Sequence, residues 1–188
     1  MLLRLHGVNI VLSLLTLRLI RMVIVVMGVT GSGKTTIGSM LAARLGWDFA
    51  DADEFHSAEN KAKMHQGIPL TDADRTPWLA AIHERIAQWL AEKRNVVLAC
   101  SALKQSYRQQ LWTGPEVRFV YLRGTYDLIA ERLRARKGHF ADEHILAGQF
   151  ADLEEPTDAV VVDISATPND IVDEICRRLG LAAAPAKL

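Results

Sequence analysis

A glycine-rich segment constrains the fold of this chain more than any other part of its sequence. Residues 28–35 read Gly-Val-Thr-Gly-Ser-Gly-Lys-Thr, which matches G-x-x-x-x-G-K-[ST] at every position. Glycine backbones can bring N–H groups close to phosphate oxygens, Lys34 can reach the β- and γ-phosphates, and the Thr35 hydroxyl can bind Mg²⁺. We therefore expect a nucleotide-phosphate site here. Its predicted ligands are Gly28, Val29, Thr30, Gly31, Ser32, Gly33, Lys34, Thr35 and Thr36.

The segments on either side of this loop predict the class of fold. Residues 23–27 are a short β-branched run, which is typical of a strand buried on both faces of a parallel sheet. The helix that follows would point its positive end at the phosphates. Further strands are expected at 47–50, 95–100, 117–122 and 160–164, and helices at 77–92, 105–112, 126–136 and 168–179. This alternation predicts an α/β P-loop NTPase fold with three layers and a central parallel sheet.

The bulk composition gives no sign of a nucleic-acid or membrane partner. The 188 residues carry 22 basic and 22 acidic side chains, so no global field attracts nucleic acid or an anionic membrane. The two cysteines, Cys100 and Cys176, form neither a CxxC motif nor a metal-ligand cluster. We expect reduced cysteines and a cytoplasmic protein.

The two ends of the chain are expected to lie outside the domain. Residues 8–20 are mostly apolar, but the run is too short for a membrane helix and Arg18 interrupts it. We prefer the interpretation that Met22 is the true start and that residues 1–21 are an extension; an additional helix or a targeting segment are the alternatives. The predicted domain spans 22–181, with a tail at 182–188.

Three classes of P-loop protein remain open on the residues alone: a kinase of a small metabolite, a GTPase switch and a regulatory nucleotide-binding module. The segment 60–63, Asn-Lys-Ala-Lys, lacks the aspartate of a guanine-reading motif, and no aspartate is followed three residues later by glycine. The GTPase interpretation is therefore weak. A regulatory module needs another domain to regulate, for which this chain has little room.

From Met22 to about Leu181 the sequence resembles the gluconokinases. The resemblance rests on five blocks in order: the P-loop; 51–56; 60–79, with Asp74-Arg75 and Pro77-Trp78-Leu79; 100–108; and 136–140, followed by Gln149-Phe150 and Pro156. The third and fifth blocks are specific to the family. The second block departs from the family pattern, because Ala52 stands where a glycine is usual. That change costs little if the backbone does not need a positive φ.

The resemblance implies an activity, cofactors and an assembly. It implies transfer of the γ-phosphoryl group of ATP, with Mg²⁺, to the terminal hydroxyl of gluconate. It also implies the adenylate- and shikimate-kinase-like version of the fold, a homodimer, and a mobile lid at about 137–149. A shikimate-like kinase of another small anion and a regulator without turnover are the alternatives.

Paired aspartates are expected at the centre of the chemistry. Asp51 and Asp53 alternate across the end of a strand, so they can take separate roles. Asp51 is expected to orient Mg²⁺-bound water, whereas Asp53 is expected to accept the proton of the sugar-acid hydroxyl or to orient that hydroxyl. Lys34 completes this predicted catalytic centre.

Cationic and imidazole side chains are the candidates for binding the substrate and the phosphates. Arg75 is expected to clamp the carboxylate of the substrate, because its guanidinium can bind two oxygens at once. His56, His139 and Lys104 are further substrate candidates, each with a structural role as the alternative. The remaining catalytic candidates are Arg132 and Arg136, which share one helix face and are expected to reach the phosphates.

Overall fold

The computed structural model describes residues 21–135 and 142–184. Its elements in chain order are β1 (Val23–Met27), α2 (Lys34–Leu45), β2 (Asp48–Asp51), the short 3₁₀ helix η1 (Ala52–Phe55), α3 (Ala58–His65), α4 (Asp72–Ala91), β3 (Val96–Ala99), α5 (Gln105–Leu111), β4 (Val117–Arg123), α6 (Tyr126–Ala135), α7 (Asp142–Asp152), β5 (Val160–Asp163) and α8 (Pro168–Leu179). The extension at 1–20, Arg136, His139 and the last residues of the tail lie outside the described residues.

The five strands form one parallel sheet in the order β2-β3-β1-β4-β5. Strand β1 is central, and every residue from Val23 to Met27 is fully buried. A parallel strand covered by helices on both faces reads as a continuous apolar run, as this one does. The predicted α/β fold with a central parallel sheet is confirmed.

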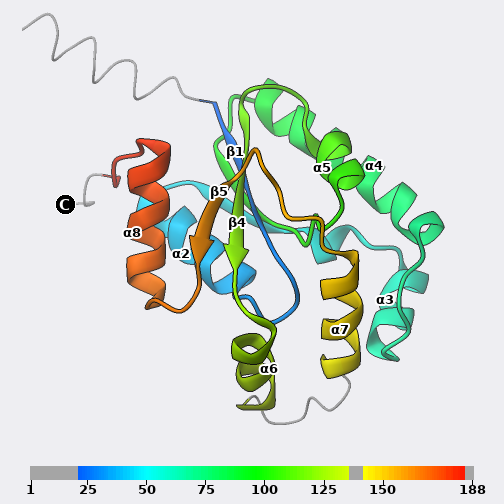
Figure 1. The fold of residues 1–188 in the computed structure, drawn as a ribbon. Coiled ribbons are helices and arrows are strands. Elements are labelled where there is room, and N and C mark those ends of the chain that lie inside the picture. Colours follow the sequence, from blue (N-terminus) through cyan, green and yellow to red (C-terminus); the bar gives the residue numbers. More distant parts are fainter. Residues whose placement is uncertain (1–20, 136–141, 185–188) are drawn as a thin grey trace, which may run out of the picture.

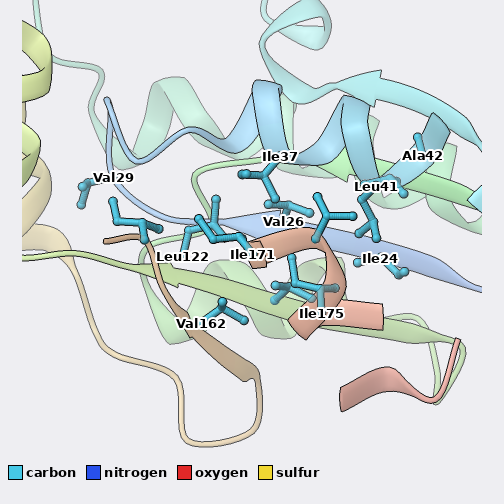
Figure 2. Close-up of a cluster of buried hydrophobic side chains, with 14 of the residues drawn as sticks. Ile24, Val26, Val29, Ile37, Leu41, Ala42, Leu122, Val162, Ile171 and Ile175 are labelled. Atoms are coloured by element: carbon cyan, nitrogen blue, oxygen red, sulfur yellow. The ribbon is translucent and has the colours of Figure 1, made fainter. Parts of the chain in front are cut away.

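Helices cover both faces of the sheet and produce the three expected layers (Figure 1). Ile24 and Val26 point to one face, where they pack with α2 and α8; Figure 2 shows this cluster, including Ile37 and Ile175. Val23, Val25 and Met27 point to the other face and pack with α4 and α5.

Helix α4 starts earlier than the sequence predicts. It begins at Asp72 rather than at Pro77, because Thr71 and Asp74 form a capping box. The Thr71 hydroxyl accepts the Asp74 N–H at 3.2 Å, and the Asp74 carboxylate accepts the Thr71 N–H at 2.9 Å. Pro77 therefore lies inside the helix. This extra turn brings Asp72 and Arg75 to the carboxyl edge of the sheet, where the candidate site lies.

Candidate active site

The phosphate-binding loop leaves the carboxyl end of β1 and enters α2. Gly28, Gly31 and Gly33 have φ values of 147°, 75° and 95°, a region that side chains other than glycine rarely adopt. A Cβ at Gly31 would lie 2.9 Å from side-chain atoms of both Ile129 and Leu133. The loop thus depends on glycine for its conformation and also for its close packing against α6.

Polar groups of the loop fit a phosphate ligand. The Ser32 hydroxyl is buried and, among the described residues, has no hydrogen-bond partner in the protein. The Lys34 ammonium donates to the carbonyl of Val29 at 2.9 Å, so the charge is held over the loop. A buried polar atom without a protein partner is costly unless a ligand or water satisfies it. Nucleotide phosphates at the N-terminus of α2 are ligands of that kind.

Oxygen ligands suited to Mg²⁺ lie beside the loop. The Thr35 hydroxyl donates to one carboxylate oxygen of Asp51 at 3.0 Å, and the other oxygen accepts the Asp53 N–H at 3.1 Å. In the described part of the chain no group of three or more His, Cys, Asp or Glu side chains could hold a metal. Mg²⁺ in kinases is held by one or two protein oxygens plus phosphates and water, so Thr35 and Asp51 fit it.

Asp53 occupies η1, directly after β2, and its carboxylate faces the same cavity as Lys34. The residue is exposed by total surface area, but protein atoms surround its carboxylate. This loss of water, followed by the nearby charge of Asp51, raises the pKa of Asp53, and Lys34 partly opposes the rise. A carboxylate with a raised pKa is a better proton acceptor than an ordinary aspartate.

The aromatic pair His56 and Trp78 supports the turn that carries Asp53. The two rings stack with centroids 4.5 Å apart and planes 8° from parallel. Trp78 Nε1 donates a buried hydrogen bond to the Ala52 carbonyl at 2.7 Å. Burial, with the charges of Lys61 and Arg75, lowers the pKa of His56 to about 4, so its imidazole is neutral at pH 7. Ala52 does not have a positive φ, so the departure from the family pattern at this position introduces no strain.

A network of charged side chains surrounds Arg75, which lines the cavity. Asp72 accepts from Lys104 at 3.0 Å, from Arg75 at 3.5 Å and from the Tyr107 hydroxyl. Asp152 of α7 lies 3.8 Å from Arg75 and 3.7 Å from Lys104. Hydrogen bonds from Tyr107 and Lys104 lower the pKa of Asp72. Each cation thus faces two carboxylates, and the network holds Arg75 in place.

The predicted site residues fall into three groups. A cavity of about 750 Å³ brings together Lys34, Thr35, Asp51, Asp53, His56 and Arg75, along with other residues of the phosphate loop. Lys104 contacts the same carboxylates as Arg75, but it does not line this cavity. Arg132 instead donates to the carbonyl of Ile164 at 2.6 Å. Arg136 and His139 lie outside the described residues.

Sequence reasoning gave no role to several residues at the site. Gln149 and Asp152 line the cavity from α7, and Tyr107 joins the charge network from α5. Arg108 is buried, and its guanidinium donates to the carbonyls of Ala102 and Leu103 at 3.2 and 2.8 Å. Gln149, Tyr107 and Arg108 do fall in blocks shared with the gluconokinases, which was the only sequence signal for them.

Two further sequence-based expectations concern the cysteines and membrane insertion. Cys100 and Cys176 are both buried and free, which confirms that they form no disulfide with each other. Burial raises the pKa of Cys100 to about 12, so its thiol stays protonated and unreactive. Among the helices that the structure describes, none combines the length and apolar character needed to span a bilayer.

A phosphate loop, a Mg²⁺-compatible oxygen pair and a carboxylate with a raised pKa around one cavity are features of P-loop kinases of small molecules. The shikimate kinase family model matches residues 30–179. More specifically, the chain belongs to the gluconokinase family. It is 43% identical over 88% of its length to a probable gluconokinase of Xenopus tropicalis, which it covers completely. It is also 43% identical to the gluconokinase of Gluconobacter oxydans, over 82% of this chain and 89% of the relative.

A solved structure agrees with this assignment. The gluconokinase from Sinorhizobium meliloti superposes with a TM-score of 0.78 at 43% identity, over 86% of this chain and 93% of that one. The family predicted from the sequence blocks is therefore confirmed.

Proposed function

We propose that this protein transfers the γ-phosphoryl group of ATP to the terminal hydroxyl of D-gluconate, giving 6-phospho-D-gluconate and ADP. The observation that carries the proposal is the shared cavity, which is lined by Asp53, by Lys34 of the phosphate loop and by Arg75. An acceptor that has both a hydroxyl and a carboxylate matches this combination of groups.

The phosphate loop and Asp53 supply the chemistry of the transfer. Lys34 and the backbone N–H groups of the loop that follow Thr30 bind the ATP phosphates, and the charge of Lys34 stabilises the transferring group. Thr35 and Asp51 would hold Mg²⁺, which would neutralise phosphate charge. Asp53 accepts the hydroxyl proton while the hydroxyl oxygen bonds to the γ-phosphorus and the bond from that phosphorus to the ADP oxygen breaks.

Arg75 and His56 supply recognition of the acceptor. Arg75 binds the carboxylate and exchanges part of its interaction with Asp152 for the substrate. Neutral His56 suits the hydroxyls of the sugar chain, since it adds no charge next to Lys61 and Arg75. Lys104 and His139 are proposed as further substrate contacts. Arg132 and Arg136 are proposed to contact the phosphates; Arg132 has to leave the Ile164 carbonyl to do so.

The family resemblance adds a homodimeric assembly and a lid at about 137–149 to the proposal. The cysteine usage adds a cytoplasmic location. Light scattering on the purified protein tests the assembly: we expect the mass of two chains, and the mass of one chain would contradict it.

A coupled assay for ADP release, run with Mg-ATP and a panel of acceptors, tests the proposed activity. The panel contains gluconate, related sugar acids, shikimate and AMP. We expect turnover that depends on gluconate and is abolished by Lys34→Ala. Brisk turnover with another acceptor and none with gluconate would refute the substrate. ATP binding without turnover on any acceptor would instead favour a regulator.

The role of Arg75 has a sharper test in the uncharged polyol glucitol, which lacks the carboxylate. Loss of a charge-assisted hydrogen bond predicts about a 10- to 100-fold rise in KM for gluconate in Arg75→Met, with little change for glucitol. Arg85→Met is the matched control, because Arg85 lies on the same helix α4 but packs over Trp89, away from the cavity. Equal effects of the two variants on gluconate would refute this role.

A further inference from the structure

Helix α7 makes polar contacts with two parts of the candidate site, the phosphate loop and the charge network. The Gln149 side-chain carbonyl accepts a hydrogen bond from the backbone N–H of Thr30 at 2.6 Å. Three residues later, and so on the same helix face, Asp152 lies near Arg75 and Lys104. Both α7 side chains line the cavity. One helix face therefore joins the phosphate loop to the charge network.

The Thr30 N–H lies in a turn of the phosphate loop that offers it no acceptor. The Ser32 N–H donates to the Val29 carbonyl at 3.2 Å and closes a turn around Thr30 and Gly31. In such a turn the N–H of the second residue has no partner within the turn. Glycines at 28 and 31 leave the backbone on both sides of Thr30 free to adopt other conformations. An acceptor 119 residues away in sequence supplies the missing bond.

We propose that Gln149 is a positioning residue for the phosphate-binding loop. Its carbonyl holds the Thr30 turn in the conformation seen here, and Asp152 fixes the same helix face at the charge network. Gln149 keeps this bond when nucleotide is bound, and the following N–H groups of the loop are left for the phosphates. The inference concerns the nucleotide site alone, so it stands or falls independently of the identity of the acceptor.

Binding of Mg-ADP and hydrogen exchange at the Thr30 amide test this inference on the full chain. Gln149→Met keeps the size of the side chain but removes the acceptor. Loss of one hydrogen bond predicts about three- to tenfold weaker Mg-ADP binding by calorimetry. Exchange of the Thr30 amide should accelerate by a similar factor in nitrogen-edited NMR spectra, with and without Mg-ADP.

Two further variants separate positioning from general damage to α7. Gln149→Glu retains an acceptor, so protection of the Thr30 amide should persist. Ala147→Met places the same side chain at an exposed position of α7 that does not line the cavity, and it should change neither readout. If the methionine variant at 149 does not fold, Gln149→Asn, whose amide is one methylene shorter, provides the comparison.

Several outcomes would overturn the inference. Unchanged or tighter Mg-ADP binding by Gln149→Met would mean that Gln149 is idle or competes with phosphate for the Thr30 amide. Unchanged Thr30 exchange in that variant, or lost protection in Gln149→Glu, would show that the hydrogen bond does not hold the loop. Loss of Thr30 protection on adding Mg-ADP to the unmodified chain would show that the bond breaks when nucleotide binds.

Discussion

The buried hydrogen bond from Trp78 to the backbone of η1 offers a quantitative test of how the site is built. Trp78 is only 4% exposed, and its Nε1 lies 2.7 Å from the Ala52 carbonyl. That carbonyl belongs to the turn between Asp51 and Asp53, so the bond positions both predicted catalytic carboxylates. Trp78→Phe keeps an aromatic ring for His56 to stack on, but it removes the donor.

The cost of this substitution follows from burial. Leaving the Ala52 carbonyl without a partner costs about 1–3 kcal/mol of unfolding free energy. The smaller ring leaves a small cavity, which adds about 1 kcal/mol. For a chain of this size, a total of about 2–4 kcal/mol lowers Tm by roughly 4–16 °C. Because the turn carrying Asp53 is loosened, kcat should fall as well.

Calorimetric melting at pH 7 measures the effect, and Trp112→Phe is the matched control. Trp112 is 54% exposed, so the same chemical change there should alter the unfolding free energy by less than about 0.5 kcal/mol. Equal melting temperatures for the two variants would refute the reasoning that the buried Trp78 bond supports the site.

Three further predictions concern the carboxylate, the imidazole and the loop. Asp53→Asn should lower kcat by about 10²- to 10⁴-fold. Because the folded state raises the Asp53 pKa, this variant should also be more stable than the unmodified chain at pH 7. The difference in melting temperature should vanish as the pH falls below 3.8. A variant that is less stable at pH 7 would contradict the raised pKa. The pKa of His56 is lowered from 6.5 to about 4, so its contribution to stability is complete above pH 6.5 and is lost as the pH falls from 6.5 towards 4. Relative to His56→Gln, the unfolding free energy of the unmodified chain should therefore fall by roughly 1.4 kcal/mol per pH unit over that interval in urea titrations. Parallel pH profiles of the two proteins would contradict this. Gly31→Ala combines a positive φ with contacts of 2.9 Å to Ile129 and Leu133, so it should lower the unfolding free energy by at least about 1–2 kcal/mol. It should also weaken Mg-ATP binding in calorimetry, and unchanged binding would refute the role given to this glycine.

Local patterns predicted the parts of this molecule that depend on local physics. The run 23–27 predicted a buried central strand, and the glycine spacing after it predicted the phosphate loop that the structure shows. Thr35 and Asp51, both assigned to Mg²⁺ from the sequence, lie within hydrogen-bond distance of each other in the structure. Parallel strands bring their carboxyl ends to one edge, so residues that follow successive strands can be expected to converge.

Contacts between distant segments could not be read from the sequence. The bond from Thr30 to Gln149 spans 119 residues, and no local period signals it. From its helix face Arg132 was predicted to reach the phosphates, whereas in the structure its guanidinium donates to a carbonyl after β5. The start of α4 was missed because Pro77 imitates a first helical residue, although Thr71 and Asp74 carry the true capping signal.

The fate of the phosphoryl group is the most direct test of the central claim. Phosphorus NMR of a reaction containing the full chain, Mg-ATP and gluconate distinguishes transfer from hydrolysis. We predict one phosphate monoester for each ADP, with the coupling pattern of a phosphate on a CH₂ oxygen, and almost no inorganic phosphate. Inorganic phosphate equal to ADP, an ester on a secondary hydroxyl, or no ADP at all would contradict the account.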